Sequence, residues 1–174
     1  MAHLEIEKKF LVKRARWQKQ GTPYRLRQGY LDTNGPGTVR VRIHPDGALL
    51  TLKGPAQNDA REEFEYPIPA SDAERILETL CAGRVVDKLR YRVHCAAFVW
   101  EVDVFLGNNA GLVVAEVETE SVERLTEAVA QRPPWVGDEV SDDPRFRNSR
   151  LARRPFADWP HDERRELEHR LDDP

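Results

Sequence analysis

The hexapeptide EIEKKF at residues 5–10 decides the fold, because its charged side chains recur at every second position. Successive side chains of a β-strand point to opposite faces, so Glu5, Glu7 and Lys9 share one face while the isoleucine and the phenylalanine lie on the other. The stretch is therefore expected to be a strand with one charged face and one apolar face.

The same alternation recurs along the chain, most clearly in Arg40-Val41-Arg42 and Glu116-Val117-Glu118. A sheet face that only meets water would also carry Ser, Thr, Asn and Gln, whereas these faces are almost purely carboxylate, guanidinium and ammonium. The pattern favours a closed barrel with a charged lumen, and helices packed outside it. Strands are expected at about residues 4–11, 24–31, 38–43, 48–53, 61–68, 88–94, 98–105 and 112–119.

Turn signals pair some of these strands as antiparallel hairpins. His44-Pro45-Asp46-Gly47 joins the third and fourth strands, because proline presets its own dihedral and Asp-Gly tolerates positive φ. Residues 107–111, rich in Gly and Asn, join the last two strands in the same way.

Helix signals lie between and after the strands. Ser71-Asp72-Ala73-Glu74 has the spacing of a capping box and begins a helix that ends before Gly83. A second helix is expected at 122–131, where Pro133-Pro134 stops it. Both can cover apolar outer faces of the barrel.

The last part of the chain is highly charged. A helix is expected over residues 162–171, where Leu167 and Leu171 are the only apolar anchors, and a frayed tail is the favoured interpretation. The predicted organisation is one main domain over residues 1–155 and a charged, helical C-terminal tail over 156–174.

Bulk properties exclude several functional classes. The 174 residues carry a formal charge of -3, so no overall basic charge indicates a nucleic-acid partner. The sequence shows neither a signal-peptide core nor a run of about 20 apolar residues, so we expect a cytoplasmic protein without a membrane contact. Cys81 and Cys95 have no metal-ligand spacing and are expected to be reduced thiols. The oligomeric state is left open, a homodimer included.

The lumen-facing charges predict chemistry on a polyphosphate. Carboxylates are hard oxygen ligands that suit Mg²⁺ or Mn²⁺, and without a metal they would repel one another. Guanidinium and ammonium groups suit the many oxygens of a polyphosphate, and no P-loop motif is present. The predicted metal ligands are Glu5, Glu7, Glu116 and Glu118. The predicted phosphate-facing cations are Lys9, Arg40, Arg42, Lys53, Lys88 and Arg90.

An ordered set of motifs resembles the CYTH-type triphosphate tunnel metalloenzymes, in particular their short bacterial group. The ExExK signature fits residues 5–9, and the resemblance extends over roughly residues 2–151. It implies an eight-stranded antiparallel barrel, mainly β within the α+β class, whose tunnel binds divalent metal and a linear triphosphate. The other matching motifs are residues 28–31, 39–43, 52–54, 88–91, 100–105, 115–118, 140–143 and 148–151.

The resemblance implies metal-dependent hydrolysis of inorganic tripolyphosphate to pyrophosphate and phosphate. One ion would be held by Glu5 and Glu7 and a second near Glu116 and Glu118. Two lysines, Lys88 and Lys9, would be catalytic and stabilise the leaving oxygen. The residues expected to bind the triphosphate are Arg40, Arg42, Lys53 and Arg90.

Alternative functions remain open from the sequence. A class IV type adenylate cyclase or a thiamine triphosphatase would use the same metals and cations, and a non-catalytic polyphosphate- or nucleotide-binding module is the alternative outside enzymes. Further charged residues share the inward register and are left outside the predicted site. They are Arg61, Glu63, Glu65, Arg92, Glu101 and Asp103, while the facing of Arg25 and Arg27 is ambiguous.

Overall fold

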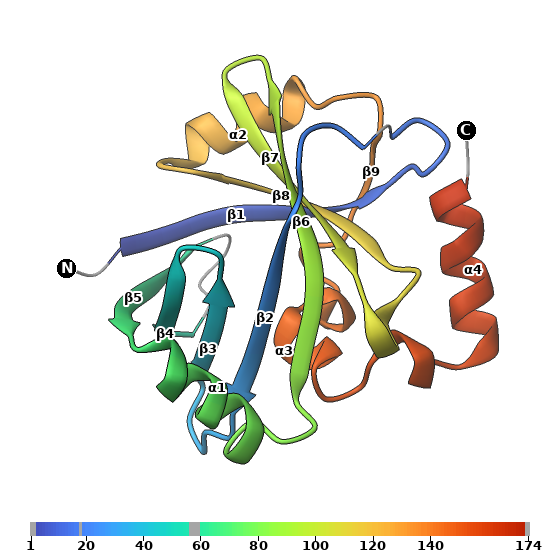
Figure 1. Cartoon of the computed structure of the whole chain (residues 1–174). Coiled ribbons are helices and arrows are strands. Elements are labelled where there is room, and N and C mark those ends of the chain that lie inside the picture. The colour runs from blue at the N-terminus through green and yellow to red at the C-terminus, as the bar shows by residue number, and fades with distance from the viewer. Residues whose placement is uncertain (1–2, 18, 56–59, 173–174) are drawn as a thin grey trace.

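The computed structural model describes residues 3–17, 19–55 and 60–172 and shows a closed antiparallel barrel (Figure 1). Its eight strands follow the order β5-β4-β3-β2-β6-β7-β8-β1, and the pairing of β5 with β1 closes the ring. All eight expected strands are present. They are β1 (His3–Val12), β2 (Tyr24–Leu31), β3 (Thr38–His44), β4 (Gly47–Lys53), β5 (Ala60–Ile68), β6 (Val85–Cys95), β7 (Phe98–Phe105) and β8 (Val113–Thr119).

The long first strand holds the barrel together because it pairs with three neighbours. Its first residues pair with β5, its middle with β8, and its last residues with an additional strand, β9 (Val136–Glu139). The sequence did not predict β9, because four residues are too few to show an alternating pattern. The expected hairpins between β3 and β4 and between β7 and β8 are confirmed as antiparallel pairs.

The described residues form four α-helices outside the strands: α1 (Ala70–Thr79), α2 (Val122–Ala130), α3 (Asn148–Leu151) and α4 (His161–Asp172). Short 3-10 turns occur at Gly107–Asn109, Pro144–Phe146 and Phe156–Asp158. The capping-box prediction was wrong, because the N-cap of α1 is Pro69, two residues before Ser71, and it makes no side-chain capping bond. Ser121 does cap α2, where its side chain accepts a hydrogen bond from the backbone N–H of Arg124 at 3.3 Å.

The outer faces of the strands are covered by the helices and by aromatic side chains. In α1, Ala73 and Leu77 are buried against the sheet beside β3 and β4. On another side, Trp100 contacts Phe10 and Trp135 edge to face in the cluster that also contains the buried residues of α2. None of the described helices has both the length and the apolar character needed to span a membrane.

The C-terminal segment is docked on the barrel rather than frayed, which corrects the interpretation made from its charge. Leu167 and Leu171 of α4 are 3% and 0% exposed, and they join a cluster with Phe146 and Trp159. The two leucines were visible in the sequence, but their partners lie far away along the chain. The last residues of the predicted tail, 173 and 174, lie outside the described residues.

One end of the barrel interior is apolar. Leu11, Val86, Phe105 and Val114 continue the inward-facing series of their strands, and they belong to the same buried cluster as the C-terminal segment. The charged part of the lumen therefore lies toward the other end.

Candidate active site

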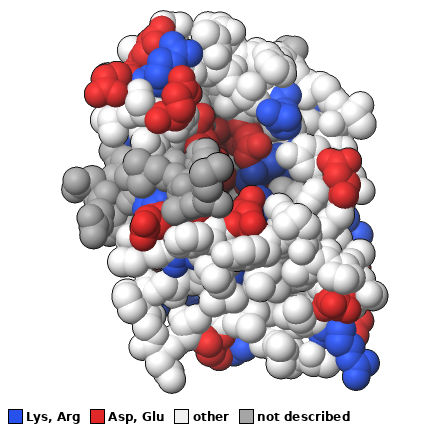
Figure 2. All heavy atoms as spheres, turned by 90° about the vertical axis from the view of Figure 1, so that its left-hand side faces the viewer, with Lys and Arg blue, Asp and Glu red and all other residues white. Residues whose placement is uncertain are grey.

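A cavity of about 620 Å³ occupies the charged part of the barrel. Figure 2 shows it as a hollow in which acidic and basic side chains meet. Among the described residues, the basic side chains that line it are Lys9, Arg40, Arg42, Lys53, Arg61, Arg90 and Arg147. The acidic ones are Glu5, Glu7, Glu63, Glu65, Glu101, Glu116, Glu118 and Asp142.

The structure brings together all the predicted site residues except Lys88. The four predicted metal ligands, the four predicted triphosphate-binding cations and Lys9 line the cavity. Lys88 is 0% exposed and lies behind the cavity wall, so its contact with a substrate stays a prediction.

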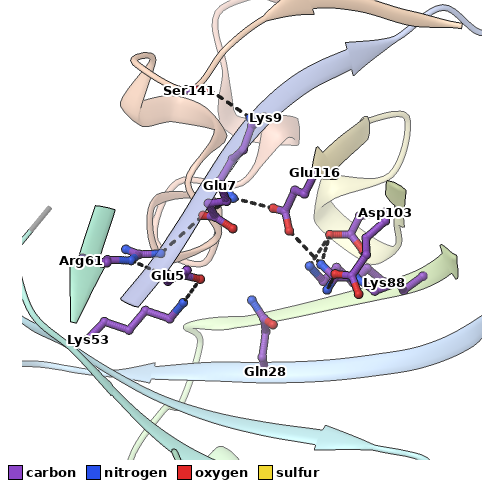
Figure 3. Close-up of polar contacts among 12 residues, drawn as sticks. Glu5, Glu7, Lys9, Gln28, Lys53, Arg61, Lys88, Asp103, Glu116 and Ser141 are labelled. Carbon is purple, nitrogen blue, oxygen red and sulfur yellow. Dashed lines mark hydrogen bonds and ion pairs between the residues drawn. The ribbon is translucent and has the colours of Figure 1, made fainter. Parts of the chain in front are cut away.

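Glu5 is held between two cations at one side of the cavity (Figure 3). Its carboxylate accepts hydrogen bonds from Lys53 Nζ and, at 2.5 Å, from Arg61 Nε. Burial alone would raise the pKa of Glu5, but the charges of Lys53 and Arg61 outweigh it and lower that pKa. Lys53 also contacts Glu63 at 3.0 Å, so a residue left outside the predicted site is part of it.

Lys9 bridges two carboxylates on neighbouring strands. Its Nζ donates to Glu7 Oε1 at 2.8 Å and to Glu116 Oε1 at 2.7 Å. Burial opposes its charge, but Glu116 and Glu7 raise the pKa of Lys9 above its usual value, so it stays an ammonium. Its backbone N–H donates to Ser141 Oγ at 3.0 Å, which ties the C-terminal segment to the first strand.

Asp103 contacts both Lys88 and Arg90 of β6 beneath the cavity. Its carboxylate accepts two bonds from Arg90, at 2.6 and 2.7 Å, and one from Lys88 Nζ at 2.5 Å. Burial and the nearby Arg90 charge lower the pKa of Lys88 to about 8, although Asp103 acts in the opposite direction. Arg90 reaches further to Glu116 at 2.9 Å and also contacts Glu101. Both carboxylate oxygens of Glu116 are thus engaged by cations.

Glu118 differs from the other carboxylates of the lumen. Within the described residues it makes no hydrogen bond or ion pair, and its neighbours are also acidic. Burial, together with repulsion from Glu5, Glu7 and Glu63, raises the pKa of Glu118 to about 7. Negative charge is therefore in excess around this side chain.

A buried polar chain runs from Arg42 into β2. Arg42 Nε donates to Gln28 Oε1 at 3.3 Å, and Gln28 Nε2 donates to Tyr30 Oη at 2.7 Å. Tyr30 lines the cavity, and its hydroxyl hydrogen remains available for a further acceptor. The inward face of β2 thus holds Gln28 and Tyr30, whereas Arg25 and Arg27 point outward to Asp87 and Glu74.

A smaller opening of about 300 Å³ shares two side chains with the main cavity. Glu101 and Glu118 line both spaces, while Arg92 and Glu120 line only the smaller one. Glu101 and Glu118 therefore lie at the border between the two spaces.

The sequence missed the part of the wall that comes from the C-terminal segment. That wall lies after the last barrel strand, where no alternating pattern indicates which side chains face the cavity. Its cavity-lining members are Ser141, Asp142, Arg147, Asn148 and Ser149. The only signal was the family motif, which matched without assigning roles to these residues.

A family model described as the CYTH domain matches residues 3–146, which include the whole barrel. The chain belongs to the CYTH domain family. This confirms the resemblance found in the sequence. The match ends just before Arg147, so α3 and α4 lie beyond the matched part of this CYTH protein.

Relatives of this CYTH chain cover nearly all of its length. An inorganic triphosphatase of Acetivibrio thermocellus is 43% identical over 155 residues, 89% of this chain and 97% of that protein. An inorganic triphosphatase of Nitrosomonas europaea is 36% identical over 155 residues, 85% of this chain and 96% of that protein. The crystal structure of an inorganic triphosphatase has a TM-score of 0.61 at 33% identity and covers 85% of this chain and 93% of that one.

The carboxylates of this CYTH barrel fit a divalent metal by charge and by ligand type. Glu118 gathers excess negative charge with Glu5, Glu7 and Glu63, and carboxylate oxygens are ligands that Mg²⁺ and Mn²⁺ accept. In the described ranges, no three acidic, histidine or cysteine side chains are already grouped to hold an ion. A metal would therefore have to draw these carboxylates together.

The raised pKa of Glu118 predicts a specific pH dependence for the metal-free CYTH protein. The pKa of its carboxyl is about 7 in the folded state, above its usual value of 4.5, so the folded protein holds this proton more tightly. Its ionisation therefore costs no stability below about pH 4.5, and the free energy of unfolding falls as the pH rises through about 7. Urea unfolding with chelator at about pH 5 and about pH 8 should show a smaller loss of stability for Glu118→Gln than for wild type. Equal losses in the two proteins would contradict the assignment.

Proposed function

We propose that this protein hydrolyses inorganic tripolyphosphate to pyrophosphate and phosphate with the help of Mg²⁺ or Mn²⁺. The observation that carries the proposal is the cavity itself, where a row of cations faces carboxylates with uncompensated charge around Glu118. A linear triphosphate with its metal ions supplies the opposite charge to both groups. The names of the relatives support the same substrate.

The cations would bind the non-bridging oxygens of the triphosphate. Arg40 donates to Glu63 and Glu65 through one Nη, while its buried Nε–H has no acceptor among the described residues. An anionic substrate would supply that missing acceptor. Arg42, whose pKa burial and Arg40 lower, has no carboxylate partner in the described chain. The proposed binding residues remain Arg40, Arg42, Lys53 and Arg90.

The proposed metal ligands are Glu5, Glu7, Glu116 and Glu118, and we add Glu63 because it shares the negative charge around Glu118. A bound divalent ion would neutralise phosphate oxygens and acidify the attacking water. Glu116 would first have to release Lys9 or Arg90. These carboxylates would bind the metal on the acidic side of the cavity, while the cations bind the substrate.

The proposed catalytic residues are Lys9 and Lys88. Lys9 lines the cavity as an ammonium that can stabilise charge on the leaving oxygen. The role proposed for Lys88 requires that its ammonium leave Asp103 and enter the cavity.

Removal of divalent metal is expected to abolish turnover, because only a metal can relieve the repulsion among these carboxylates and acidify the water. Phosphate release from tripolyphosphate should stop in excess chelator and return with added Mg²⁺ or Mn²⁺. Ca²⁺, with its looser geometry, should restore little of it.

The substrate is tested by the same assay with a panel of thiamine triphosphate, ATP and pyrophosphate, together with a cyclic AMP measurement. Tripolyphosphate should give the highest kcat/KM. Preference for a thiamine or nucleoside triphosphate, or formation of cyclic AMP, would overturn the proposed substrate. Binding of tripolyphosphate without any turnover would instead indicate a binding module.

A further inference from the structure

The C-terminal segment brings a cation, Arg147, to the wall of the cavity. Arg147 lies one residue beyond the match to the CYTH family model, and no predicted role covers it. Two neighbours on the same turn, Asn148 and Ser149, also line the cavity. A charged side chain and two polar side chains thus face the site from outside the barrel strands.

The backbone of this turn is firmly placed. Phe146 and Leu151, on either side of it, are 2% and 0% exposed. The amide of Leu151 donates to the carbonyl of Arg147 at 2.9 Å, and the amide of Val140 donates to the carbonyl of Lys9 at 2.8 Å. The guanidinium of Arg147 is exposed on this fixed backbone, so it can reach a ligand without a rearrangement of the fold.

The charge of Arg147 is available, in contrast to that of most cations in the cavity. Its guanidinium makes no hydrogen bond or ion pair with any described residue. An anion can therefore bind Arg147 without displacing a carboxylate. The cavity cations that already contact carboxylates are Lys9, Arg40, Lys53, Arg61 and Arg90.

Asn148 adds an amide donor to this part of the wall. Its Oδ1 is buried, but its Nδ2 is not buried and makes no hydrogen bond with a described residue. The Nδ2 hydrogens can therefore donate to an anion in the cavity. The hydroxyl of Ser149 can donate as well.

We infer that Arg147, with Asn148 and Ser149, forms an anion subsite that binds one terminal phosphate group of the substrate. The inference rests on the proposed function and adds a chain-length determinant to it. A triphosphate long enough to reach this wall gains the contact, whereas pyrophosphate held among the barrel cations does not. The C-terminal segment therefore selects for a third phosphate group.

The test compares Arg147→Ala with Arg150→Ala. Arg150 is an exposed arginine of α3 that does not line the cavity and makes no side-chain hydrogen bond or ion pair with a described residue, so it controls for the general loss of positive charge. Steady-state kinetics on tripolyphosphate would be combined with calorimetric binding of its non-hydrolysable imido analogue and of pyrophosphate, all with Mg²⁺. Thermal melting of each variant would verify the fold.

Arg147→Ala should raise KM and the Kd of the imido analogue about tenfold to a hundredfold, the usual effect of one charge-assisted contact. The kcat and the affinity for pyrophosphate should stay the same, and Arg147→Lys should recover part of the loss. Arg150→Ala should change none of these values.

Three results would contradict the anion subsite. The affinity for the imido analogue could be unchanged in Arg147→Ala, or the affinity for pyrophosphate could fall as much as that for the analogue. Arg150→Ala could also weaken analogue binding as much as Arg147→Ala does. Failure of the proposed function has a different signature. In that case wild-type protein would release no phosphate from tripolyphosphate, while analogue binding would still decide whether Arg147 contributes.

Discussion

Replacement of Glu118 by alanine is expected to lower the turnover of tripolyphosphate at least about a hundredfold, without unfolding the protein. Glu118 has no ion-pair partner in the described chain and lies among other carboxylates, so it is the side chain most dependent on a metal. Its removal takes away a metal ligand and also relieves repulsion. In chelator, the free energy of unfolding should be unchanged or higher than in wild type.

The matched control is Glu62→Ala, which removes an exposed carboxylate from β5 outside the cavity. Its kcat should stay near the wild-type value. The prediction needs kcat, denaturant unfolding and Mg²⁺ titration on both variants. A Glu118→Ala protein with normal turnover would show that this carboxylate does not hold the metal.

The change Asp103→Asn is expected to lower the free energy of unfolding by about 3–5 kcal/mol. Asp103 is 0% exposed and is the shared partner of Lys88 and Arg90. The amide keeps the shape of the side chain but removes its charge, and it leaves two buried cations to repel each other. Urea unfolding at neutral pH would measure the loss.

The matched control is Asp87→Asn on the outer face of β6, the strand that pairs with β7 of Asp103. Asp87 also pairs with an arginine, but Arg25 is largely exposed, so the loss there should stay within about 1 kcal/mol. In the Asp103→Asn background, Lys88→Met should restore part of the stability because it removes the buried cation that has lost its carboxylate, whereas Arg90 keeps Glu101 and Glu116. Equal losses for Asp103→Asn and Asp87→Asn would mean that the buried network contributes no more than a surface ion pair.

The barrel was predictable because each strand repeats a two-residue pattern. The alternation at residues 5–10 gave the inward face of β1, and the same rule placed Glu116 and Glu118 opposite the cations of β3 and β6. The register between strands was not predictable, since alternation fixes a face but not a partner. The sequence therefore does not show that Glu63 contacts Lys53 in the site.

The sequence also did not show how deeply each inward-facing side chain lies in the lumen. Lys88 and Arg90 have the same inward alternation, yet Arg90 lines the cavity and Lys88 lies buried below it. The docking of α4 depended on contacts of Leu167 and Leu171 with a distant part of the chain. Long-range contacts of this kind leave no local pattern.

The ion pairs that fill the cavity mean that ligands must compete with the protein's own charges. A triphosphate that binds Lys53 and Arg61 removes both cations that hold Glu5, and a metal that binds Glu5 removes one carboxylate from each of these cations. Binding of the anion thus exposes carboxylates for the metal, and binding of the metal exposes cations for the anion. Linkage requires that each ligand raise the affinity for the other by the same factor. We therefore expect the barrel to bind a cation and a polyanion cooperatively, and either one alone to be a poor ligand.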